Sequence, residues 1–110
     1  MKKDHHSDRT RFNLFLTNSQ AQSLWRLLDV GLTMSAIARQ SIRKCSEMPL
    51  FPDDDGPFPV RLNFYLDPPD VESLSIIALR ESSPKASVLR RLIDTYLSEP
   101  ENAAAIDRLF

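Results

Sequence analysis

The chain has 110 residues, with 14 Lys and Arg against 15 Asp and Glu, which gives a formal net charge of −1. This length predicts one compact domain, and a single Cys excludes a disulfide framework or a Cys-rich zinc site. No apolar stretch is long enough for a membrane span or a secretory signal, so we expect no membrane association. Near-neutral charge is unusual for a nucleic-acid-binding protein, since most of these are basic.

The charge is unevenly distributed along the chain. Residues 1–47 carry eight basic and four acidic side chains, a balance of +4. Residues 48–110 carry six basic and eleven acidic side chains, a balance of −5. Such asymmetry favours a local basic face that the whole-chain charge conceals.

The first predicted elements are a tail and a strand. We expect residues 1–8 to form a weakly basic tail. His5 and His6 have no third metal ligand at a suitable spacing, so we expect no metal site there. Period-two alternation over residues 11–16 then predicts a half-buried strand. Its inner face carries Phe12, Leu14 and Leu16, and its outer face carries Arg11, Asn13 and Phe15.

Two helices are predicted after this strand. Thr17 and Gln20 fit a capping box for the first helix, and Gly31-Leu32 marks a break before a second helix capped by Thr33. Both helices are amphipathic. Their apolar positions are Ala21, Leu24, Leu27 and Leu28 in the first helix, and Met34, Ile37, Ala38, Ile42 and Cys45 in the second.

Residues 48–59 form a predicted linker. This segment holds four prolines, one of the two glycines and the acidic run Asp53-Asp54-Asp55. Proline cannot donate to a helix or sheet ladder, so no regular element is expected here. We expect the acidic run to be solvated.

An internal repeat follows the linker. Residues 61–67 match residues 11–17 in chemical type at an offset of 50, and the similarity continues through the predicted helices. The second copy therefore predicts a strand, a helix capped by Asp67 and a helix capped by Ser83, with Pro68 and Pro84 at the first helical positions. Residues 99–110 are expected to form a tail or a short helix. The apolar positions of the repeated helices are Val71, Leu74, Ile77 and Ala78, then Val88, Leu89, Leu92, Ile93, Tyr96 and Leu97.

The two copies, residues 9–47 and 60–98, solve a common packing problem. One strand with two short helices leaves its backbone donors unpaired, whereas two such units can pair their strands antiparallel under four helices. The predicted fold is mainly α with a two-stranded antiparallel ribbon, formed by two units that make a pseudo-dimer. Pairing Asn13 with Asn63 would place Arg11 opposite Tyr65 and Arg61 opposite Phe15, as cross-strand cation–aromatic pairs.

This arrangement, with an Arg-x-Asn strand and a hydroxyl-capped second helix, resembles the ribbon-helix-helix (Arc/MetJ/CopG) superfamily. A chain that carries both units is similar to the tandem type found in TraY-like conjugation accessory proteins. The resemblance covers about residues 9–98. It implies a bacterial cytoplasmic protein whose exposed ribbon face enters the DNA major groove.

The resemblance also implies the contact residues. Arg can bind guanine through two acceptors, and Asn matches the edge of adenine. The N-terminus of each second helix would hold a phosphate through its free N–H groups. The implied base-reading residues are Arg11, Asn13, Phe15, Arg61, Asn63 and Tyr65, and the implied phosphate-anchoring residues are Thr33, Met34, Ser35, Ser83 and Lys85.

Two departures from the family pattern leave alternatives open. Phe15 and Tyr65 stand where the family often has polar or basic residues, and they fit either thymine methyl groups or a protein contact. Pro84 removes one backbone donor from the second phosphate site, and Lys85 offers compensation.

Two classes of function fit the sequence. The first is sequence-specific binding of double-stranded DNA, as a transcription regulator or a plasmid-conjugation (relaxosome) accessory protein, with further copies bound at adjacent sites. The alternative is a protein-interaction module such as an antitoxin or anti-repressor, with a partner bound through Phe15 and Tyr65 or the C-terminal segment. No nucleophile, base or phosphate-binding loop is recognisable, so we expect neither catalysis nor a cofactor.

Overall fold

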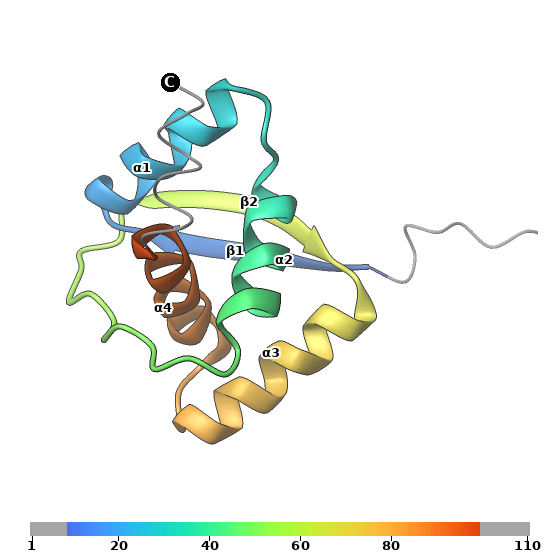
Figure 1. The fold of residues 1–110 in the computed structure, drawn as a ribbon. Helices are drawn as coiled ribbons and strands as arrows, with labels where there is room; N and C mark the ends of the chain where they lie inside the picture. The colour runs from blue at the N-terminus through green and yellow to red at the C-terminus, as the bar shows by residue number, and fades with distance from the viewer. Residues whose placement is uncertain (1–8, 100–110) are drawn as a thin grey trace, which may run out of the picture.

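The computed structural model describes residues 9–99. Within this range the elements follow the order β1 (Thr10–Leu16), α1 (Asn18–Asp29), α2 (Met34–Cys45), β2 (Val60–Leu66), α3 (Pro68–Glu81) and α4 (Lys85–Ser98). The predicted fold class is confirmed at this level: the structure is mainly helical with one two-stranded antiparallel sheet (Figure 1). The expected tail at residues 1–8, and residues 100–110 of the expected C-terminal segment, lie outside the described residues.

The two strands pair in the antiparallel register that places the two Asn residues opposite each other. Asn13 lies opposite Asn63, Arg11 opposite Tyr65, and Phe15 opposite Arg61. The predicted cation–aromatic contacts are wrong, because neither arginine of the ribbon makes a cation–ring contact in the described part of the chain. The opposed side chains share a face without holding each other.

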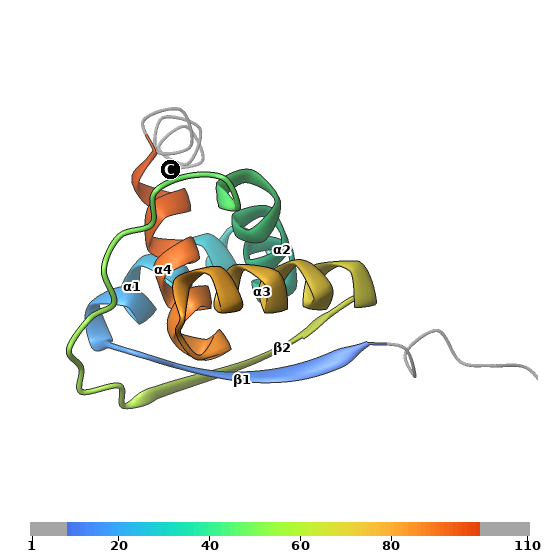
Figure 2. The same ribbon diagram turned by 90° about the horizontal axis from the view of Figure 1, so that it is seen from below.

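All four helices cover one face of the ribbon (Figure 2). The buried strand residues are Leu14 and Leu16 in β1, and Phe64 and Leu66 in β2. Phe12 and Phe64 stack across the strands, with ring centroids 5.8 Å apart. The predicted apolar stripes of the helices supply the rest of the core, although Leu28, Val71, Ala78, Tyr96 and Leu97 are only partly buried.

The helix caps agree with the prediction in the first copy (residues 9–47, unit 1) and differ from it in the second copy (residues 60–98, unit 2). The Thr17–Gln20 capping box is present, and the Thr33 hydroxyl accepts a hydrogen bond from the Ala36 N–H. Asp67 occupies the N-cap of α3 but makes no capping hydrogen bond, and its carboxylate pairs with Arg9 at 3.2 Å. Pro68 is the first helical residue, as predicted.

The predicted Ser83 cap is wrong. Pro84 is the N-cap of α4, in an extended conformation with ψ 152°, and the helix begins one residue later at Lys85. Because Pro84 keeps an extended ψ, helical geometry starts only after it, and Ser83 lies one position before the N-cap. Its hydroxyl instead donates to the Glu81 carbonyl, close to the left-handed turn at Ser82, where φ is 53°.

The linker contains no helix or strand, as predicted. Its acidic run is only partly solvated, contrary to expectation. The Asp53 carboxylate binds the Arg90 guanidinium through two hydrogen bonds, of 3.0 and 2.7 Å. Phe51 is hydrogen-bonded to α4 as well. Its N–H donates to Thr95 Oγ1, and its carbonyl accepts from Arg91 Nε. The linker is therefore attached to α4 at Phe51 and Asp53.

The core prediction can be tested with two leucines of α3. Leu74 is fully buried, whereas Leu79 is 81% exposed. We expect Leu74→Ala to lower the free energy of unfolding by about 2–5 kcal/mol, because it leaves a cavity. Leu79→Ala should change it by less than about 0.5 kcal/mol. Chemical denaturation monitored by circular dichroism measures both, and equal losses would contradict the described packing of α3.

Candidate nucleic-acid interface

The outer face of the ribbon is free of helices (Figure 2). Its side chains come from alternate positions of the two strands, so the same pleat that buries the leucines exposes this set. All six predicted base-reading residues lie together on it and are exposed: Arg11, Asn13, Phe15, Arg61, Asn63 and Tyr65. Among the described residues, the side chains of the two Arg and two Asn make no hydrogen bond or ion pair, which leaves their donors available to a ligand.

Phe15 and Tyr65 add a large apolar component to this face. Their exposed fractions are 46% and 48%. Rings exposed to this extent give up part of the free energy that full burial would provide. Register pairs each ring with an arginine of the other strand. The face therefore presents an Arg and an aromatic ring at each end, with two Asn side chains between them.

The ribbon edges are supported differently on the two sides. At the end defined by Arg11 and Tyr65, the Tyr65 N–H donates to Ser35 Oγ at the start of α2, over 3.1 Å. At the end defined by Arg61 and Phe15, the Phe15 carbonyl accepts a hydrogen bond of 3.0 Å from Arg90 of α4. We refer to these as the Arg11 end and the Arg61 end.

The N-terminus of α2 lies at the Arg11 end. The Met34 side chain is buried, so Met34 can offer a ligand only its backbone. The Thr33 hydroxyl accepts from the Ala36 N–H, which leaves the N–H groups of Met34 and Ser35 without an acceptor among the described residues. Two donors at a helix N-terminus are suited to an anion.

The N-terminus of α4 keeps more donors than the sequence predicted. Pro84 lies before the helix and not within it, and no side chain caps α4. The N–H groups of Lys85, Ala86 and Ser87 consequently have no acceptor in the described chain, while the Val88 N–H bonds to the Pro84 carbonyl. Lys85 is exposed beside them, whereas Ser83 is turned toward Glu81.

Arg90 is the residue near this face that sequence reasoning missed. Its side chain is 11% exposed, donates to Asp53 and to the Phe15 carbonyl, and lies over the Phe58 ring at 4.1 Å. Burial would raise the pKa of Asp53, but hydrogen bonds from Arg90 and Ser87 outweigh it and hold that pKa below its ordinary value. A charged residue in an amphipathic helix gives no sequence sign of such contacts.

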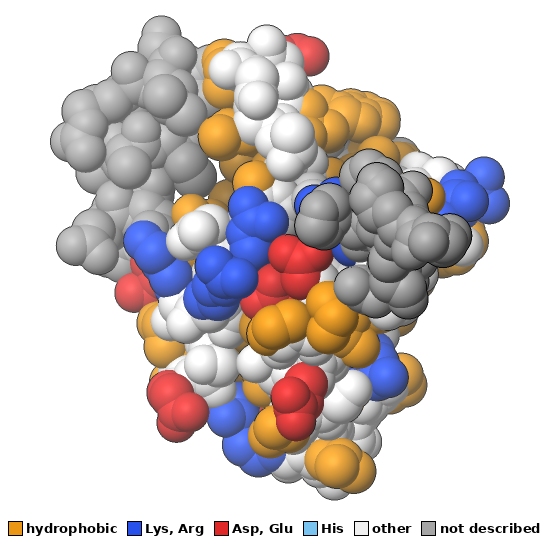
Figure 3. Space-filling view, turned by 90° about the vertical axis from the view of Figure 1, so that its right-hand side faces the viewer, with side chains coloured by type: hydrophobic (Ala, Val, Ile, Leu, Met, Phe, Trp, Pro, Cys, Tyr) orange, Lys and Arg blue, Asp and Glu red, His pale blue; other side chains and the backbone are white. Residues whose placement is uncertain are grey.

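A second ion pair joins the two units away from the ribbon. Asp70 is 3% exposed, and Arg43 of α2 binds both of its oxygens at 3.2 and 3.4 Å. Figure 3 views this side of the molecule and shows basic side chains next to acidic and hydrophobic ones. Arg9 and Arg43 of the first copy are therefore in ion pairs, in contrast to Arg11 and Arg61.

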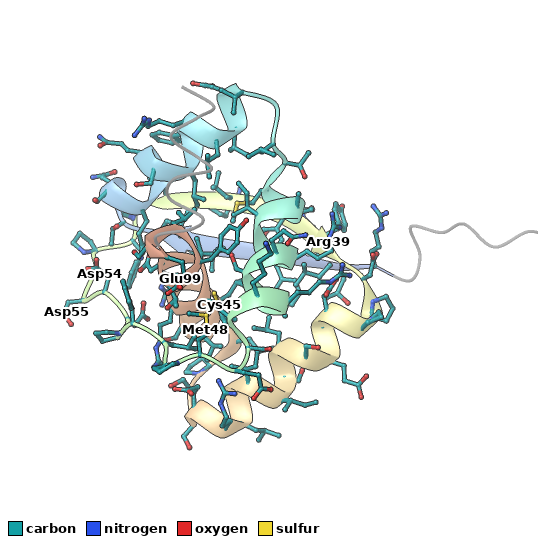
Figure 4. The ribbon with its side chains drawn as sticks, viewed as in Figure 1. Arg39, Cys45, Met48, Asp54, Asp55 and Glu99 are labelled. Carbon is teal, nitrogen blue, oxygen red and sulfur yellow. The ribbon has the colours of Figure 1, made fainter. Side chains whose placement is uncertain are left out.

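The sequence offers two other kinds of candidate group, a cysteine thiol and possible metal ligands. Cys45 is buried in the core, as predicted, and burial raises the pKa of its thiol (Figure 4). Residues 9–99 contain no group of three or more His, Cys, Asp or Glu that could hold a metal ion. No helix within the same range is long and apolar enough to cross a membrane.

Comparisons with protein-family models, with curated proteins and with solved structures return no match to this chain.

The Asp53–Arg90 pair makes a testable contribution to stability. We expect Asp53→Asn to cost about 1–3 kcal/mol at pH 7, because it removes a charged hydrogen-bond acceptor from a mostly buried arginine. The lowered pKa of Asp53 means that this contribution is present above the unfolded-state pKa and is lost as the pH falls through the folded-state value.

Denaturation of the wild type and of Asp53→Asn between pH 2 and pH 7 measures this effect. The difference between them should shrink in the acid range, and the exposed control Asp55→Asn should follow the wild type throughout. A deficit of Asp53→Asn that stays constant with pH would contradict the assigned pair.

Proposed function

We propose that this chain is a tandem ribbon-helix-helix protein that binds double-stranded DNA in a sequence-specific manner through the outer face of its ribbon. The observation that carries the proposal is the pairing of Asn13 with Asn63. Arg11 lies two residues from Asn13 in β1, and Arg61 lies two residues from Asn63 in β2, so the two arginines lie on opposite sides of the Asn pair. A ribbon of two strands fits the width of the major groove. Arg and Asn are the side chains suited to guanine and adenine.

The pseudo-dimer is part of this proposal. The repeat offset of 50 relates Arg11 to Arg61 and Asn13 to Asn63, and the strand register relates the same residues about the central Asn pair. Contacts of α2 with α4 and of α2 with α3 join the two halves into one core. Two equivalent units in one chain would therefore read two half-sites without a second protomer.

The two half-sites need not be identical. Phe15 and Tyr65 occupy equivalent positions, but only Tyr65 carries a hydroxyl that can hydrogen-bond to a base or a phosphate. The proposed target is an imperfect palindrome read by unlike ends. The N-termini of α2 and α4 would hold the flanking phosphates, with Lys85 adding charge at one of them.

Such a protein would act in the bacterial cytoplasm, as a transcription regulator or as an accessory protein in plasmid conjugation. Further copies would occupy adjacent sites. The proposed role involves no catalytic step and no cofactor.

A protein-interaction module is the second candidate, and the exposed face of α3 favours it. Ile76 and Leu79 are 61% and 81% exposed on this helix, and Phe15 and Tyr65 are half-exposed on the ribbon. Ile76 and Leu79 are three residues apart on one face of α3, and exposed apolar side chains that share a face are typical of protein contacts. An antitoxin or anti-repressor of this fold would bind its partner through these residues.

Selection from random duplexes, followed by gel-shift titration at fixed salt, separates the two candidates. We expect an enriched imperfect palindrome, and Asn13→Ala or Arg61→Ala should weaken binding to it by about 1–3 kcal/mol, or roughly 5- to 150-fold. The exposed control Gln22→Ala on α1 should bind as the wild type does. No enriched sequence, together with co-purification of one stoichiometric partner, would favour the interaction module.

A further inference from the structure

The two ends of the ribbon differ in how firmly the structure holds them. At the Arg61 end, the Arg90 guanidinium joins three segments that are far apart in the sequence. Nε and one terminal nitrogen bind the Asp53 carboxylate, the other terminal nitrogen donates to the Phe15 carbonyl, and the guanidinium lies over Phe58. All three nitrogens of the guanidinium therefore donate hydrogen bonds.

The linker completes the support at this end. Phe51 is fixed to α4 as well, because its N–H donates to Thr95 Oγ1 and its carbonyl accepts from Arg91 Nε. Figure 4 shows Asp54 and Asp55 further along the linker, beside the ribbon end where β2 begins. The linker, α4 and β1 therefore form one connected structure around Phe15.

The Arg11 end has no equivalent. The repeat offset places Gln40 at the position of Arg90, and among the described residues no hydrogen bond from Gln40 to the ribbon is present. The hydrogen bond from the Tyr65 N–H to Ser35 Oγ joins this end to α2, and the half-exposed Arg9–Asp67 ion pair joins it to the N-cap of α3. Arg39 of α2 lies on this side of the molecule without an ion pair in the described chain (Figure 4).

We infer that Arg90 is a positioning residue for the ribbon, and that it makes the Arg61 end read its half-site more stringently than the Arg11 end. The inference rests on the proposed DNA-binding function. A backbone fixed at the Phe15 carbonyl limits how far the Phe15 and Arg61 side chains can shift to accept a wrong base. Preorganised contacts lose more on a mismatch, because the site cannot adjust. Asp53 acts through Arg90 by fixing the guanidinium.

Three variants test this inference. Arg90→Gln removes the charge and the fork, Arg90→Lys keeps the charge without the fork, and Asp53→Asn removes the carboxylate that orients it. Ile77→Val, a buried change in α3 at a residue that makes none of the Arg90 contacts, serves as the control for a loss of stability alone. Affinities are measured for the selected duplex and for every single-base substitution of it, and Arg61→Ala identifies which half-site belongs to the Arg61 end.

Both Arg90 variants should lose discrimination about 3- to 10-fold at bases of the Arg61 half-site and keep it at the other half. Asp53→Asn should give the same one-sided loss and add little to Arg90→Gln. An equal loss in both halves, wild-type discrimination in Arg90→Lys, or a one-sided loss in Ile77→Val would overturn the inference.

Hydrogen exchange tests the same residue without DNA, so a failure of the proposed function can be distinguished from a failure of this inference. In Arg90→Gln, amides of residues 14–16 and 60–62 should exchange several-fold faster than in the wild type, while those of residues 10–12 and 64–66 keep their rates. Uniform acceleration along the ribbon, or none, would show that Arg90 does not fix one end.

Discussion

The antiparallel pairing of β1 with β2 is the interaction on which the rest of the structure depends. A lone strand leaves its N–H and C=O groups unpaired, and neither pair of helices could bury its apolar stripe without the other. Register has the same importance, because a shift of one residue in either strand would turn outward the buried side chains of that strand, Leu14 and Leu16 in β1 or Phe64 and Leu66 in β2. The pairing that closes the core is thus also what brings Arg11, Asn13, Arg61 and Asn63 onto one exposed face.

The near-neutral net charge acquires a different meaning with the structure. Arg9, Arg43, Arg90 and Arg91 form ion pairs, while Arg11 and Arg61 stay unpaired on the ribbon of the described chain. In the proposed complex few cations meet phosphate, so non-specific binding should be weak and base contacts should carry more of the affinity. Low overall charge restricts the manner of DNA binding more than it argues against it.

Periodicity and the repeat were enough to predict most of the fold. Alternation in each strand separates the two faces, and an offset of 50 relates the copies. These two patterns allow the pairing of Asn13 with Asn63 but do not select it over a register shifted by two residues, which the structure decides. Contacts between distant residues were not. Asp53 and Arg90 are 37 positions apart, and nothing in their neighbours distinguishes a paired carboxylate from a solvated one. The start of α4 was misplaced for a local reason, since Pro84 serves equally well just before a helix or within its first turn.

Side-chain amide resonances of Asn13 and Asn63 provide the most direct measurement of the proposed role of the ribbon. The protein is titrated with a DNA duplex from the region upstream of its own gene or from a nearby transfer origin. The resonances of both NH₂ groups should shift, and the shifts should saturate at one chain per duplex. The exposed face of α3 at Ile76 and Leu79 should remain unchanged. Saturable shifts confined to α3, with Asn13 and Asn63 unaffected, would contradict DNA binding by the ribbon.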